Sequence, residues 1–130
     1  MTVRDIKNNL DSASTLEPAL RATGTANGTG VDLQGYGAAM VVVHFGAYTN
    51  GTHTPSLEHS DDNSSFSAAS ASDMDGSFTA VSASAAGTTQ RVGYRGSKRY
   101  IRAVMTVASG ATGCYSSAVV VRGQATSVPV

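Results

Sequence analysis

The sequence predicts an all-β protein, an antiparallel β-sandwich or jelly-roll-like domain preceded by an extended or short-helical N-terminal arm. From about Gly30 onward, apolar residues recur with a period of two, and Gly, Asn and Asp separate these runs about every ten residues. No amphipathic helix pattern lies between them. Short strands at this spacing are typical of sandwiches and jelly rolls. We expect a single β-sandwich domain over residues 30–130 and an arm with a flexible link over residues 1–29.

The predicted arm lacks the alternating pattern. Val3, Ile6 and Leu10 have helical spacing, which suffices for about two turns of marginal helix, and Pro18 ends any continuation before the Gly-rich link. Two interpretations remain open: a frayed terminus, or an arm that becomes ordered against a neighbouring subunit. The apolar side chains that the second interpretation buries are Val3, Ile6, Leu10, Leu16 and Leu20.

The segment "AAMVVVHFGAYT" (38–49) is a predicted central strand, because its odd-numbered positions are all apolar. Asn50-Gly51 follows it and predicts a hairpin to "TPSLEHS". The segments "SSFSAASAS" and "GSFTAVSAS" repeat each other and predict two short strands, each anchored by a Phe. Two further strands, "YIRAVMTVA" (100–108) and "CYSSAVVVR" (114–122), close the predicted sandwich.

The composition limits the possible partners. Nine Lys and Arg balance nine Asp and Glu, so no global field attracts nucleic acid or a membrane. Only 14% of the residues are charged, which suits a subunit of an assembly. A single cysteine, Cys114, excludes an intrachain disulfide and is expected to be an apolar filler in a strand. No apolar run reaches the length of a signal peptide or a membrane span, so we expect synthesis in the cytoplasm, no signal-peptide secretion and no membrane partner.

Catalytic and cofactor motifs are not found in the sequence. His44 lies in the middle of a predicted strand, His53 and His59 flank Pro55, and no hydrolase or dinucleotide-binding motif accompanies them. The clusters "SDDNS" and "SDMDGS" could present oxygens to a cation, but the glutamate that completes a calcium loop is missing, and such residues usually form turns. We expect no enzymatic activity, no cofactor and no metal.

The segment "QRVGYRGSKRYIRAVMTV" (90–107) is unusually basic. Five of the nine cationic side chains lie here, interleaved with tyrosines, as on a nucleic-acid platform or on the outer face of a strand. A turn at Gly96-Ser97 predicts that residues 90–95 pair with residues 99–107. Arg91, Arg95 and Arg102 would then share the outward face.

An acidic segment could balance this charge, since residues 58–75 contain no Lys or Arg. Complementary patches suit the alignment of subunits or bridging within a sheet, whereas a nucleic-acid binder usually carries surplus positive charge. We therefore expect no direct nucleic-acid partner. The charged residues predicted at an interface with another subunit are Arg91, Arg95, Arg102, Glu58, Asp61 and Asp62.

Three strings, "VDLQGY" (31–36), "SDDNSSF" (60–66) and "GSKRYIR" (96–102), carry a resemblance that extends over about residues 28–113. In this order they resemble small structural proteins of tailed bacteriophages and of phage-derived gene transfer agents. Asn63 stands where a glycine might be expected, and a left-handed turn tolerates Asn well.

The resemblance implies a virion accessory protein on an HK97-type capsid: a β-sandwich decoration, cement or vertex (spike-base) protein. Its implied partners are the major capsid protein, further copies of itself in a homo-trimer or homo-pentamer, and a head-fibre protein. The implied location is the capsid exterior, where it stabilises the shell or anchors a fibre. The resemblance carries over no active site.

Two other functions remain open. A carbohydrate- or host-surface-binding sandwich of a fibre or tail could use loops that contain Tyr48, His53, Asp61 and Asp62, although the absence of Trp counts against a sugar platform. A nucleic-acid binder would use the basic segment and would lose affinity steeply with salt.

Overall fold

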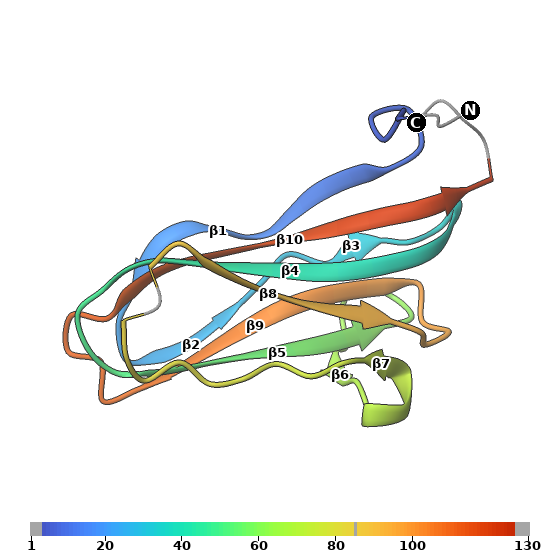
Figure 1. Cartoon of the computed structure of the whole chain (residues 1–130). Helices are drawn as coiled ribbons and strands as arrows, with labels where there is room; N and C mark the ends of the chain where they lie inside the picture. Colours follow the sequence, from blue (N-terminus) through green and yellow to red (C-terminus); the bar gives the residue numbers. More distant parts are fainter. Residues whose placement is uncertain (1–3, 85, 127–130) are drawn as a thin grey trace.

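The computed structural model of the chain, which describes residues 4–84 and 86–126, consists of two antiparallel sheets (Figure 1). Sheet A has the strand order β1-β10-β4-β8-β7, and sheet B has the order β2-β9-β5-β6 with β3 also paired to β9. The strands of sheet A are β1 (Asp11–Arg21), β4 (Tyr36–Tyr48), β7 (Met74–Asp75), β8 (Thr88–Tyr94) and β10 (Cys114–Ala125). The other elements are β2 (Gly24–Asn27), β3 (Val31–Asp32), β5 (Thr52–Ser60), β6 (Ser67–Ala68), β9 (Tyr100–Ala108) and the 3₁₀ turn η1 (Ala71–Asp73).

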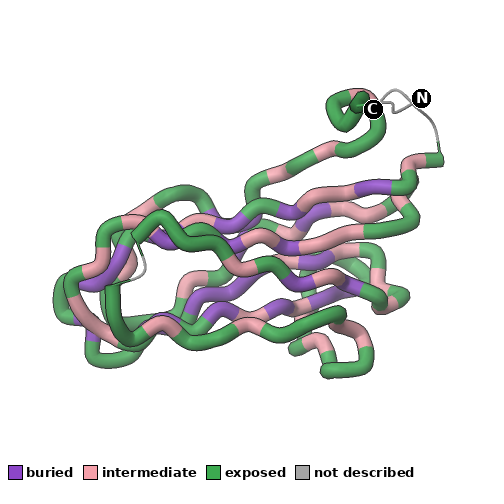
Figure 2. The backbone as a smooth tube through the Cα atoms, in the orientation of Figure 1, coloured by how far each residue is buried: buried purple, intermediate pink, exposed green. Residues whose placement is uncertain are grey.

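The core lies between the sheets, where alternate residues of the long strands meet. In β4 the inward side chains Val41, Val43 and Phe45 are fully buried, as the alternation predicts. In β9 the set formed by Ile101, Ala103, Met105 and Val107 packs into the same cluster from the other sheet. The alternation of buried and exposed positions follows the long strands in Figure 2. The predicted all-β sandwich is thus confirmed, while its jelly-roll-like character stays a prediction.

The prediction of an N-terminal arm over residues 1–29 is wrong for the described part of that segment beyond residue 10. β1 pairs with β10 through eight residue pairs from Asp11↔Arg122 to Arg21↔Cys114, and β2 pairs with β9. The Oγ of Thr15 accepts a hydrogen bond from the Ala103 N–H at 3.1 Å and donates one to the Thr29 carbonyl at 2.8 Å. Residues 11–27 are therefore edge strands of both sheets.

Sequence pattern did not reveal β1 because it is an irregular strand. Its register shifts between Ser14 and Leu16 and again between Leu16 and Ala19, so a period of two is interrupted. Pro18 lies in the second irregularity and is tolerated because β1 pairs only with β10 and is an edge strand of sheet A. The predicted short helix is reduced to a turn, closed by the Leu10 N–H donating to the Ile6 carbonyl at 2.9 Å.

Both hairpin predictions are wrong in the same way. The turn at Asn50-Gly51 connects β4 of sheet A to β5 of sheet B, and the segment with Gly96-Ser97 connects β8 of sheet A to β9 of sheet B. These turns reverse the chain direction, but their flanking strands pair with other partners: β4 with β8 and β10, and β9 with β5. The chain crosses between the layers at both places.

The repeated Phe segments form less strand than expected. The first copy contributes only the two residues of β6, and the second contributes one isolated bridge, Val81↔His53. Phe66 and Phe78 are both partly buried, and Phe78 packs against the core cluster. Within residues 4–84 and 86–126, no helix is long and apolar enough to cross a membrane.

Candidate functional site

The most buried ion pair in the basic segment is intramolecular. Arg102 in β9 lies opposite Glu58 in β5, and its guanidinium donates two hydrogen bonds to Glu58 Oε1 at 2.6 and 2.9 Å. The guanidinium carbon also lies 4.0 Å from the centroid of the Phe66 ring. The side chains of Arg102 and Glu58 are only 19% and 24% exposed. This pair joins two strands of sheet B, and its two charges compensate each other within the chain.

Three more cations of the segment are paired within the chain. Lys98 Nζ lies 2.7 Å from Asp61 Oδ2, and this carboxylate raises the pKa of the Lys98 ammonium. Arg99 forms a bidentate pair with Asp32 at 2.8 and 2.9 Å, and Arg95 lies 3.5 Å from Asp75. The ion pairs thus balance the basic segment largely against acidic residues of the same molecule.

The expected common outward face of the three arginines does not form. Arg91 lies in β8 of sheet A opposite Val42, whereas Arg102 lies in β9 of sheet B, and Arg95 follows the end of β8. Arg91 is exposed, and no ion pair is found for it among the described residues. The spacing argument failed because it assumed that β8 and β9 were hydrogen-bonded neighbours.

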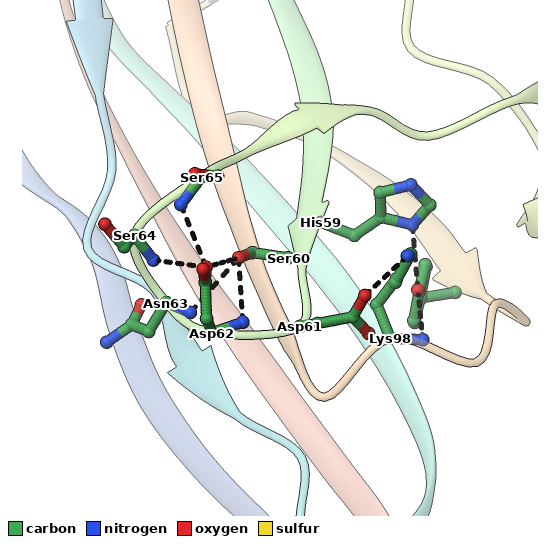
Figure 3. A network of polar contacts seen from close by, with 9 residues as sticks. His59, Ser60, Asp61, Asp62, Asn63, Ser64, Ser65 and Lys98 are labelled. Atoms are coloured by element: carbon green, nitrogen blue, oxygen red, sulfur yellow. Dashed lines mark hydrogen bonds and ion pairs between the residues drawn. The ribbon is translucent and has the colours of Figure 1, made fainter.

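The cluster around Asp62 is a turn (Figure 3). Asp62 Oδ1 accepts hydrogen bonds from the N–H groups of Ser64 and Ser65, each at 2.9 Å, and from the Ser60 hydroxyl at 2.8 Å. These donors, led by the Ser65 N–H, lower the pKa of the Asp62 carboxyl. Asn63 has a φ of 59°, in the left-handed region that the sequence predicted for it. The turn interpretation of "SDDNS" is confirmed.

The Asp62 turn makes stability depend on pH in acid. A carboxyl group has a pKa of about 3.9 in an unfolded chain, and the folded value is lower, so its stabilisation is present above that value and lost as pH falls through the folded pKa. We expect Asp62→Asn to lower the melting temperature at pH 6, because a neutral amide oxygen accepts these hydrogen bonds more weakly than a carboxylate does. At pH 3 the difference should be smaller, because the wild-type carboxyl loses part of its charge whereas the amide does not titrate. Calorimetry at both pH values tests this; an equal difference at both would contradict it.

Two of the three histidines are buried and contact groups within the chain, and the third is exposed. His53 is fully buried, and its Nε2 lies 2.9 Å from the Asn50 carbonyl. His59 is 8% exposed, with Nδ1 2.9 Å from the hydroxyl of Tyr94, which in turn accepts the Lys98 N–H at 3.1 Å. Burial raises the pKa of Tyr94. His44 is exposed on the outer side of β4.

The residues proposed for a sugar site do not come together. Tyr48 at the end of β4 and His53 near the start of β5 have ring centroids 5.9 Å apart, and the Tyr48 hydroxyl lies 2.8 and 2.9 Å from the carbonyl oxygens of Gly51 and Ser82. Asp61 and Asp62 follow the other end of β5, about 25 Å away along an extended strand. That grouping was wrong because β5 is a continuous strand between the two sets.

A pocket of about 320 Å³ lies at the end of the sandwich where the β3–β4 and β8–β9 connections meet. Its lining includes Tyr36, Tyr94, Lys98 and Arg99. Because Lys98 and Arg99 already bind Asp61 and Asp32, the pocket has little uncompensated charge with which to select a ligand. Elsewhere in the described ranges, no group of three or more His, Cys, Asp or Glu could hold a metal ion.

The predicted interface residues of the first segment separate into different environments. Leu16 is 3% exposed and belongs to the core, because it faces inward from β1. Ile6, Leu10 and Leu20 are 67%, 37% and 46% exposed, so they remain available to a partner. Val3 lies outside the described residues. Cys114 is fully buried in β10, where burial raises the pKa of its thiol, so its expected role as an apolar filler is confirmed.

Two exposed apolar residues were not among the predicted interface residues. Tyr115 and Val119 are 51% and 37% exposed on β10. In the described part of the chain, the large hydrophobic side chains that are exposed are these two together with Ile6, Leu10 and Leu20. The signal was present in "CYSSAVVVR", where apolar residues occupy both faces of the strand, but periodicity alone does not tell which face is covered.

The fold and these contacts define a two-sheet antiparallel β-sandwich with internally paired charges and a partly apolar surface. No protein-family model and no curated protein matches the chain. Among solved structures, the chain is similar to the PBSX exported protein XepA, with a TM-score of 0.57 and 22% sequence identity. The alignment covers 100% of this chain and 42% of XepA, so the chain spans less than half the length of that protein. At this identity the similarity establishes the fold.

Proposed function

We propose that the chain is a virion structural accessory protein that binds the outside of an HK97-type capsid as a decoration, cement or vertex (spike-base) protein. In this role it stabilises the shell or anchors a fibre, without catalysis and without a cofactor. Its partners are the major capsid protein and further copies of itself as a trimer or pentamer, and its location is the exterior of the virion.

The observation that carries this proposal is the division of the surface. Charged residues of the basic and acidic segments are largely paired within the chain, whereas the large exposed apolar side chains gather around β1 and β10. An apolar patch on a surface otherwise made of small or polar side chains favours assembly over the recognition of a charged ligand. The structural neighbour, the PBSX exported protein XepA, has a similar fold.

Binding to particles tests the proposal. Purified chain is added to capsids that lack it, from the phage or gene transfer agent encoded in the same genome, and the mixture is sedimented. We expect the chain to sediment with the shells, and cryo-electron microscopy to show added density outside the shell at symmetry-related positions. An unrelated neutral β-sandwich of similar mass is the control. Failure to sediment above this control, at micromolar concentration, would contradict capsid binding.

A further inference from the structure

The two outer faces of the sandwich differ in chemistry. On sheet B, the outward positions of β5 include Thr54 and Ser56, and those of β9 include Arg102 and Thr106. Val104, the apolar outward residue of β9, is only 4% exposed. The outer face of sheet B is thus polar.

The outer face of sheet A is largely apolar over β4 and β10, apart from the facing pair His44 and Ser117. The register places Val119 opposite Val42 and Val121 opposite Met40, and all four alternate with inward core residues. Tyr115 stands on the same side over Gly46, where a Cβ would lie 3.0 Å from the Tyr115 Cβ. We define the apolar face as Met40, Val42, Tyr115, Val119 and Val121.

Neighbouring segments extend this apolar face at both ends. Leu20 in β1 lies opposite Tyr115, and Leu10 reaches Gly123, where a Cβ would lie 2.8 Å from Leu10 Cδ2. A hollow beside β10 is lined by Leu10, Met40 and Val121, and Ile6 borders the adjacent one. All the large exposed hydrophobic side chains of the described residues therefore lie on or beside the apolar face.

The edges of the sheets are poorly suited to pairing with another chain. At one edge of sheet A, β1 carries Pro18 and two register shifts; at the other, β7 has two residues. The edges of sheet B are the short strands β2, β3 and β6. Short, irregular edges and an edge proline oppose strand addition, so association by extending a sheet is disfavoured. Association through the outer face of a sheet is the alternative.

We propose that the apolar face of sheet A packs against the same face of other copies of this chain. The five residues of the apolar face carry no charge, and the cations Arg91, on β8, and Lys7, which lines the hollow next to Val121, lie at its margins, where they can stay in solvent when two copies pack face to face. In a closed cyclic oligomer the same patch of every copy can face the common axis. This proposal rests on the self-association part of the proposed function and does not depend on capsid binding.

The area is sufficient for a specific contact. The outer face of sheet A over β1, β10, β4 and β8, of which the apolar face occupies the two middle strands, has four strands spaced about 4.8 Å apart and about seven residues of about 3.4 Å, which gives roughly 450 Å² per copy, or about 900 Å² for two. Flanking residues such as Leu10 and Leu20 bring the total near the 1,000 Å² that specific interfaces reach, so roughly the whole face is needed. The small outward residues Ser12, Ser14 and Ser117 allow close approach of the second copy.

Sedimentation velocity of the wild type and of Val119→Glu tests the proposal. We expect the wild type to oligomerise at micromolar concentration and Val119→Glu to weaken association at least about 100-fold, because the oligomer would bury an unpaired carboxylate. Thr106→Glu, exposed on the outer face of sheet B, is the matched control and should associate like the wild type. Circular dichroism checks folding, and Tyr115→Glu replaces Val119→Glu if that variant does not fold.

Each outcome has a distinct meaning. A wild type that stays monomeric at about 100 µM overturns the proposal, as does an oligomer that both face variants retain. A monomeric wild type whose particle binding is lost in Val119→Glu would overturn it in favour of a capsid protein on this face. An oligomer that dissociates in the face variants but never sediments with capsids supports this proposal and contradicts the proposed function.

Discussion

A chain that begins at residue 30 is expected not to fold. The deletion removes β1 and β2, which are edge strands of the two sheets, and with them Leu16 of the core and the buried Thr15 hydroxyl. The Ala103 N–H would lose its acceptor, and one side of both β10 and β9 would be uncovered. Circular dichroism and thermal melting should show no cooperative transition.

The matched control for this deletion removes residues 1–5, which lie before the first strand and leave all of β1 in place. We expect that variant to melt cooperatively within about 5 °C of the full chain, because it keeps β1, β2 and the core residue Leu16. If the chain starting at residue 30 also melted cooperatively near the full-length temperature, residues 11–27 would not be part of the folding unit.

Phe45→Ala is expected to reduce the free energy of unfolding by about 3–5 kcal/mol, since it leaves a large cavity between the sheets. Phe45 is among the largest fully buried side chains and lies in β4, between β10 and β8. The neighbouring substitution His44→Ala, on the outer side of the same strand, should change stability by no more than about 0.5 kcal/mol. Urea unfolding of both variants measures the difference; equal losses would place Phe45 outside a tightly packed core.

The layers of the sandwich could be predicted from the sequence because alternation reports burial directly. Val41, Val43 and Phe45 had to face one side of β4, and the structure buries all three. The turn at Asn63 was equally local, because its left-handed φ and the Asp62 hydrogen bonds depend on adjacent residues. Features decided within one strand or one turn were therefore predictable.

Features that depend on strand partners were not predictable. Asn50-Gly51 and Gly96-Ser97 signal a reversal of the chain, but the same reversal can close a hairpin or carry the chain to the other sheet. Consequently Arg91 and Arg102 were assigned to one face and lie on two sheets, whereas the pairing of Arg102 with Glu58 follows from the β5–β9 register. The sequence showed that the charges balance, but the strand order of the sheets determines which charged residues pair.

The pairing of β1 with β10 also governs the order in which the molecule can form. Asp11 and Arg122 are direct partners although 111 residues separate them, and an ion pair joins their side chains. Closing so long a loop costs entropy before any contact repays it, which gives β-sandwiches their high contact order and slow folding. Of the described strands, β1 is synthesised before the others and β10 after them, so β1 has no partner strand until β10 is complete. The edge of sheet A that β1 forms is therefore completed late in folding, after the other strands of the sandwich have been made.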